Sequence, residues 1–86
     1  MPRYYFCIYE GNELVPDEEG SEFDSPEAAV QGAARAAAEI GMSRLAKGDL
    51  RDVVIEVRDE RRQRVFTVTA SMKIEWHTPL SLIPRP

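Results

Sequence analysis

The densest group of side chains that could do chemistry is an acidic one early in the chain. It consists of Asp17, Glu18, Glu19, Glu22 and Asp24. Carboxylate oxygens are the ligands that Ca²⁺ and Mg²⁺ prefer. The group lacks the alternating ligand spacing and the central glycine of a dedicated calcium loop. We therefore expect a solvated turn closed by Gly20, with no metal and no other cofactor.

A nucleophile with a base is the second possibility. Cys7 is the only cysteine and His77 the only histidine of the chain, and an imidazole beside a thiol makes it a better nucleophile. Nothing in the sequence brings these two residues together or supplies a third, orienting group. A cysteine in an apolar strand is usually a packing residue. We expect Cys7 to pack, and we assign no catalytic residue.

The basic residues concentrate in one short stretch of the chain. Several tyrosines in another stretch could stack on nucleic-acid bases. These residues are Arg58, Arg61, Arg62 and Arg64, with Tyr4, Tyr5 and Tyr9. Acidic residues alternate with these arginines, and the whole chain has a formal charge of -4, from 15 acidic and 11 basic residues. A binder of the phosphate backbone needs a clustered basic face. We expect a solvated hairpin tip and no nucleic-acid partner.

Large apolar side chains continue past the last expected strand, where a small domain has little with which to cover them. They are Trp76, Leu80, Leu82 and Ile83. Either they fold back over the exposed side of the sheet or they contact a second subunit, and both alternatives stay open. These four residues are the candidate partner contacts.

One helix is expected near Pro26 to Lys47. Ser25 before Pro26 is a capping signal, and Gly48 can take the left-handed conformation that ends a helix. The spacing of small and apolar residues predicts one buried face, formed by Ala29, Ala33, Ala36, Ala37 and Ile40. Gly41 is expected to loosen the helix, because glycine in a helix costs about 1 kcal/mol relative to alanine.

Four strands are expected around this helix: residues 3–9, 21–24, 52–58 and 65–76. The first has apolar side chains on both faces and is predicted to be central, the second is a short edge, and the last is long. We predict an α+β fold, a two-layer ββαββ sandwich with one antiparallel sheet in the order 2-1-3-4 and the helix on one face. Residues 1–70 form the domain, and residues 71–86 are the end of the last strand and an extended tail.

Two segments carry a resemblance to a known family. The opening Met1-Pro2-Arg3-Tyr4-Tyr5-Phe6, the loop Pro16-Asp17-Glu18-Glu19-Gly20 and the later Glu56-Val57-Arg58-Asp59 resemble a family of small bacterial proteins classed as a domain of unknown function. The resemblance covers about Met1 to Ala70 and implies a small α/β domain without an assigned activity. Cys7 stands where the family commonly has an acid, and Arg61 and Arg62 replace its glycine-containing turn.

The totals limit the function classes. With 86 residues the chain has room for one domain. A single cysteine, a start without an apolar signal region and no apolar run of membrane-spanning length favour the cytoplasm.

We expect a small non-enzymatic interaction module that forms a homodimer and can have a further protein partner. One alternative is an antitoxin-like regulatory domain, because residues 16–29 resemble the strand-turn-helix of bacterial antitoxins. The second is a small metal-dependent or thiol enzyme.

Overall fold

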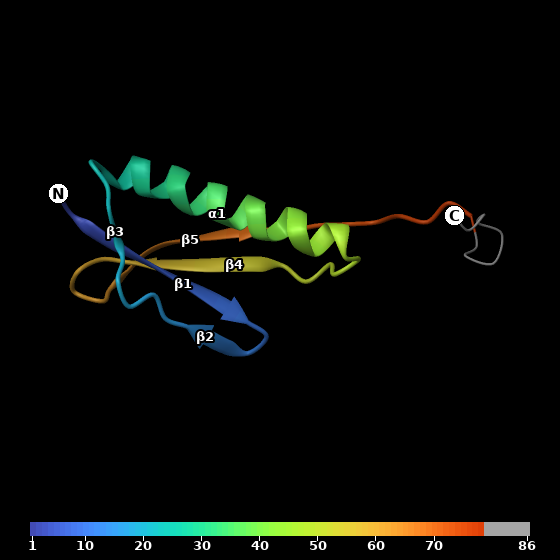
Figure 1. The fold of residues 1–86 in the computed structure, drawn as a ribbon, viewed down its shortest axis with the longest axis horizontal. Helices are drawn as coiled ribbons and strands as arrows, with labels where there is room; N and C mark the ends of the chain where they lie inside the picture. The colour runs from blue at the N-terminus through green and yellow to red at the C-terminus, as the bar shows by residue number, and fades with distance from the viewer. Residues whose placement is uncertain (79–86) are drawn as a thin grey trace.

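The computed structural model describes residues 1–78, which form a single helix packed on one face of an antiparallel sheet (Figure 1). The elements are β1 (Arg3–Glu10), β2 (Glu13–Val15), β3 (Ser21–Glu22), α1 (Pro26–Ala46), β4 (Val53–Arg58) and β5 (Arg64–Ala70). The sheet order is β2-β1-β4-β5, and β3 also pairs with β1. The predicted fold class is confirmed, with β3, β1, β4 and β5 in the predicted order and β1 in the interior of the sheet.

The helix begins and ends through local signals that the sequence contains. The Ser25 hydroxyl accepts a hydrogen bond from the Ala28 backbone N–H at 3.1 Å, and Pro26 occupies the first turn. At the other end the Asp49 N–H donates to the Arg44 carbonyl at 2.8 Å, and Gly48 has a φ of +77°. The predicted helix is therefore confirmed to within one residue, with Lys47 as its C-cap.

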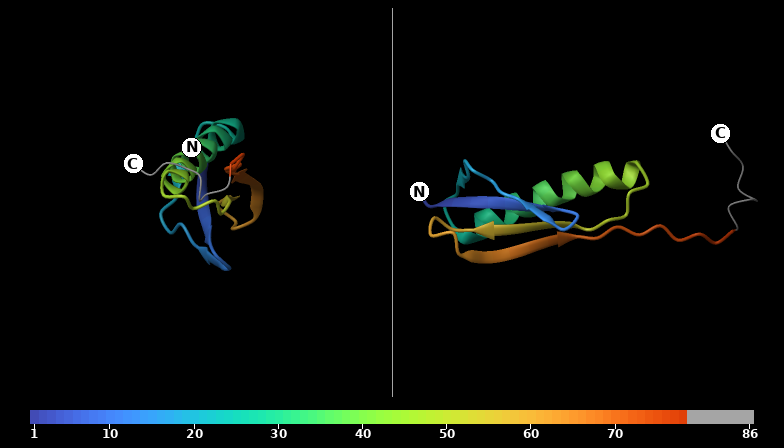
Figure 2. Two further views of the ribbon diagram at one scale, coloured as in Figure 1. Left: turned by 90° about the vertical axis from the view of Figure 1, so that its right-hand side faces the viewer. Right: turned by 90° about the horizontal axis from the view of Figure 1, so that it is seen from below.

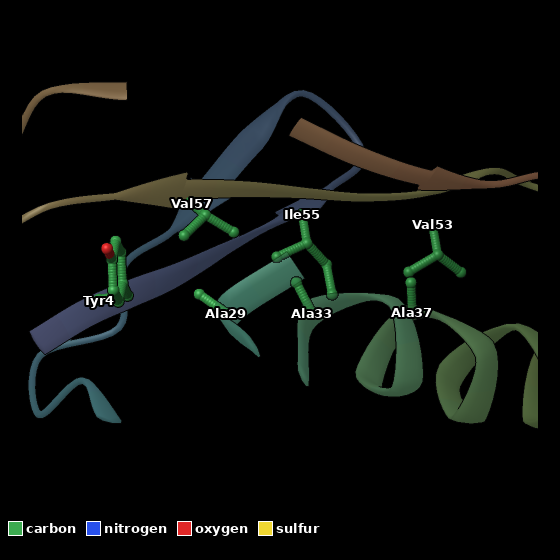
Figure 3. Close-up of a cluster of buried hydrophobic side chains, with 7 residues drawn as sticks. All are labelled: Tyr4, Ala29, Ala33, Ala37, Val53, Ile55 and Val57. Carbon is green, nitrogen blue, oxygen red and sulfur yellow. The ribbon is translucent and has the colours of Figure 1, made fainter. Parts of the chain in front are cut away.

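The core lies between one row of small helix residues and the helix-facing side of β4 (Figure 3). Ala29, Ala33 and Ala37 are at most 1% exposed, and they pack against Val53, Ile55 and Val57, which are fully buried. Alanine side chains let the helix backbone come close to a sheet. Tyr4 of β1 closes one end of this cluster, while Ala36 and Ile40, also expected on the buried face, lie half-buried at its margin.

Gly41 continues the same row of small residues, and the helix is not interrupted there. The helix runs through Gly41 to Ala46, and Gly41 is buried. A Cβ built on Gly41 would lie 3.1 Å from the Met72 sulfur and 3.7 Å from the Ala70 Cβ. The missing side chain therefore allows a close contact between the helix and the chain just past the end of β5.

The last strand is shorter than predicted, because β5 ends at Ala70 and not at Trp76. The reason is its neighbour: Ala70 pairs with Val53, which is the first residue of β4. Beyond Ala70 no ladder partner is left among residues 1–78. Met72 still packs against the core cluster, and the segment after it continues away from the helix and sheet (Figures 1 and 2).

The sheet has one strand that the sequence did not predict. β2 pairs with the end of β1, with Val15 opposite Ile8 and Glu13 opposite Glu10. Its three residues are too few to show an alternating pattern, so its position is decided by the turn at Gly11 and by pairing with β1. No helix in residues 1–78 combines the length and the apolar character needed to cross a bilayer.

We predict that Ala33→Leu destabilises the domain by about 1–3 kcal/mol, because a leucine in this close contact overpacks the core. The matched control is Ala34→Leu, since Ala34 is the next residue of the helix and is exposed. Chemical denaturation of both variants measures the difference. Equal stability of the two variants would contradict the packing described here.

Candidate functional site

The acidic loop after β2 is held by the Asp17 carboxylate, which accepts hydrogen bonds from backbone N–H groups. One carboxylate oxygen of Asp17 accepts the Phe6 N–H of β1 at 3.0 Å. The other accepts the backbone N–H groups of Glu19 at 3.2 Å and Gly20 at 3.0 Å. β2 and β3 pair with opposite ends of β1, and Phe6 lies between these two pairings. Asp17 therefore provides the acceptor that an uninterrupted edge strand would have given to Phe6.

Arg3 and Gly20 fix the same loop from the other side. Arg3 donates through Nη1 to the Glu19 carbonyl and through Nη2 to a Glu22 carboxylate oxygen, both at 2.9 Å. Gly20 has a φ of +69°, and a Cβ there would lie 2.9 Å from the Tyr4 carbonyl oxygen. Only glycine fits that backbone without displacement. Within residues 1–78 no group of three or more acidic, histidine or cysteine side chains is arranged to hold a metal ion.

A buried carboxylate lies on the sheet face opposite the helix, and the sequence did not reveal its burial. Glu56 is 3% exposed. Its oxygens accept the Tyr9 hydroxyl at 3.2 Å and Arg58 Nε at 3.1 Å, and Arg64 Nε lies 3.7 Å away. The hydrogen bond to Glu56 raises the pKa of Arg58 above its ordinary value. The alternating pattern of the strand predicted on which face of the sheet Glu56 lies, but it did not predict that Glu56 is buried there.

Cys7 lies directly opposite Glu56 in the pairing of β1 with β4 and is also buried. His77 is exposed and belongs to the segment that leads away from the sheet. The structure therefore gives Cys7 a place among packed strand side chains and does not bring it together with His77.

The arginine-rich turn between β4 and β5 is organised by Asp59 and by one unusual residue. The Asp59 carboxylate accepts the Arg61 N–H at 2.8 Å and the Gln63 N–H at 3.1 Å. Arg62 has a φ of +66°, a conformation that favours glycine, and its guanidinium lies 5.0 Å from the centre of the Tyr5 ring. Tyr5 is therefore covered by Arg62, while Tyr4 lies in the core and Tyr9 binds Glu56.

A hollow of about 300 Å³ lies where the β1–β2 turn meets the end of the helix. Its lining residues are Tyr9, Gly11, Asn12, Arg44, Arg51, Asp52 and Val54. Arg44 donates to the Asp52 carbonyl at 2.7 Å, and Arg51 pairs with Asp49 at 2.7 Å. The hydrogen bond from Arg51 holds the pKa of Asp49 well below its usual range. Both guanidinium groups are thus engaged by oxygen atoms of this chain.

Comparison with protein families places these features in a wider group. Residues 3–71 match the family described as Domain of unknown function (DUF6894). The chain belongs to this family. The resemblance expected from the opening aromatics and the acidic loop is confirmed. No curated protein and no solved structure matches the chain. In this DUF6894 domain the residues that carry the resemblance have structural contacts: Arg3, Asp17 and Gly20 hold the edge of the sheet together.

Two exposed apolar side chains, Ile74 and Trp76, lie beyond residue 71, where the match to the DUF6894 family ends. Trp76 is 59% exposed and Ile74 is 42% exposed. Both belong to the extended segment that follows β5, the strand at one end of the sheet order. Of the predicted partner contacts, Leu80, Leu82 and Ile83 lie outside the residues that the structure describes. Trp76 is thus the predicted contact that can be placed, on an uncovered segment beside an edge strand.

We predict that Asp17→Ala destabilises the DUF6894 domain by about 1–3 kcal/mol, because it removes the acceptor of backbone N–H groups that are partly shielded from water. Glu18→Ala is the matched control, since Glu18 is the exposed neighbour in the same loop. Thermal unfolding of both variants at the same pH measures the effect. Equal stability of the Asp17→Ala and Glu18→Ala variants would show that the Asp17 carboxylate does not have this role.

Proposed function

We propose that this chain is a small non-enzymatic interaction module that forms a homodimer through the outer edge of β5 and the segment that follows it. The observation that carries the proposal is the exposure of Trp76 and Ile74, 59% and 42%, on an extended segment next to an edge strand. Large apolar side chains in such a position favour contact with another protein surface.

The backbone of the same region supports an added strand. β5 is a seven-residue strand that pairs with β4 on one side, and it is the last strand of the sheet. The outer edge of such a strand offers N–H and C=O groups that can pair with a further strand. Past Ala70 the pairing with β4 stops, so the following residues gain backbone partners only from elsewhere.

The non-enzymatic part of the proposal rests on how the reactive side chains are engaged. Asp17 accepts backbone N–H groups, and Glu56 is bound by Tyr9 and Arg58. Cys7 is buried in β1, whereas His77 is exposed in the segment that follows β5. We infer the cytoplasm as the location, because a single buried free thiol suits a reducing compartment.

We expect light scattering behind size exclusion to give twice the monomer mass for the full-length chain. A chain that ends at Met72 is expected to give the monomer mass, because it lacks Ile74 and Trp76 but keeps the Met72 contact with the core. Far-UV circular dichroism checks that the shortened chain is folded.

A double variant tests the same contact without shortening the chain. Ile74→Ser with Trp76→Ser is expected to weaken the dimer. Val30→Ser is the matched control, because Val30 is an exposed apolar residue of the helix, 41% exposed. A full-length chain that runs as a monomer at every concentration would contradict the proposed homodimer.

A further inference from the structure

The segment after β5 has a pattern that is complementary to itself when reversed. Around Ile74 the order is Met72, Lys73, Ile74, Glu75 and Trp76: apolar, positive, apolar, negative, apolar. An antiparallel copy of this segment therefore presents an anion opposite each cation and an apolar residue opposite each apolar residue. A two-fold interface between identical chains needs this kind of complementarity, because each contact occurs twice.

The structure shows on which side of the segment these residues lie. Met72 faces the helix, since its sulfur lies 3.1 Å from where a Cβ on Gly41 would be. Side chains alternate along an extended chain, so Ile74 and Trp76 follow Met72 on the helix side. Lys73 and Glu75 share the other side, and their charged groups pair within the chain at 2.7 Å. Both charged side chains are mostly exposed, 78% and 56%.

We infer that two copies of this chain pair antiparallel along residues 72–76, with the two-fold axis at Ile74. Ile74 then lies opposite itself, Lys73 lies opposite the partner's Glu75, and Met72 lies opposite the partner's Trp76. This inference rests on the proposed homodimer and specifies its register. The two extended segments would then pair side by side and connect the two sheets, with both helices on the same side.

The charges select this register over its neighbours. Both helices lie on the same side only if the two-fold axis passes through a residue, because a one-residue shift of the pairing turns one copy over. The alternative registers are therefore those in which the axis passes through a residue other than Ile74. An axis at Lys73 places Lys73 opposite itself, and an axis at Glu75 places Glu75 opposite itself. Like charges directly opposite each other destabilise a sheet, and opposite charges stabilise it. Only the axis at Ile74 gives two attractive pairs, from Lys73 of each copy to Glu75 of the other.

The same register gives Trp76 a contact surface that residues 1–78 of its own chain do not provide. Trp76 lies past the end of the strand and is 59% exposed. Met72 is half-buried and is supported from behind by the helix at Gly41. A thioether packs favourably against an aromatic ring. Pairing Trp76 with the partner's Met72 therefore places the ring on a surface that the partner's fold already holds in place.

Charge reversal tests the register. Lys73→Glu makes both cross-strand pairs negative, and Glu75→Lys makes both positive, so we expect each variant alone to raise the dimer Kd by about fivefold or more. Mixing the two variants joins a chain with two acids to a chain with two lysines, and both cross-strand pairs become attractive. We expect the mixture to form a heterodimer about as tightly as the wild type dimerises.

The mixture also separates this effect from the ion pair within each chain. Neither variant can form the Lys73–Glu75 pair seen in one chain, so recovery on mixing must come from contacts between chains. A wild-type chain that never dimerises would reject the proposed function. A dimer whose affinity is unchanged in both variants, or is not recovered on mixing, would reject the register alone.

Disulfide trapping gives an independent measurement. In the inferred register the two copies of Ile74 have Cα atoms about 4.5–5.5 Å apart, which a disulfide can span. The two copies of residue 73 are offset along the strands and lie about 8 Å apart, which is too far. Under mild oxidation Ile74→Cys is expected to give a covalent dimer, and Lys73→Cys is not. Cys7 is buried, so the unmodified chain is the background control. More efficient trapping by Lys73→Cys than by Ile74→Cys would overturn the register.

Discussion

The close contact between α1 and the sheet is the constraint on which the other features depend. The residues of the helix that are buried, Ala29, Ala33, Ala37 and Gly41, are all alanine or glycine. Each buries little apolar area, so the core relies on the large strand residues opposite them. The row runs from Ala29 to Gly41, and Gly41 lies against Met72, two residues past the end of β5. The helix therefore contacts the first residues of the segment that follows β5.

The two edges of the sheet differ in whether the edge strand is continuous. On the side of β1 the edge is broken into β2 and β3, with the Asp17 carboxylate filling the gap and Arg3 holding the loop. Short, interrupted and charged edges resist pairing with other chains. On the other side β5 is a continuous seven-residue strand. β5 is therefore the longer and uninterrupted of the two edges.

The sheet face away from the helix is organised by polar contacts. Glu56 lies at its centre, 3% exposed, with Tyr9 and Arg58 as hydrogen-bond partners. A buried carboxylate is tolerated only when it is paired and hydrogen-bonded. Tyr9 comes from the neighbouring strand β1, whereas Arg58 lies two residues further along β4 itself and so points to the same face as Glu56. The hydrogen bond from Tyr9 to Glu56 therefore links β1 to β4 on this face of the sheet.

The sequence alone determined the features that depend on near neighbours. Ser25 and Gly48 bound the helix because capping is local, and alternation along β1 and β4 separated the two faces of each strand because the strand period is two. For Trp76 the sequence left two alternatives open, a fold back over the sheet or a contact with a second subunit. Only the tertiary structure decided where β5 ends, since that depends on Val53 being the first residue of β4. It also decided that Gly41 is a contact, that Asp17 replaces a backbone acceptor and that Glu56 is buried. Pairing and burial depend on residues far apart in the chain, and no local pattern contains them.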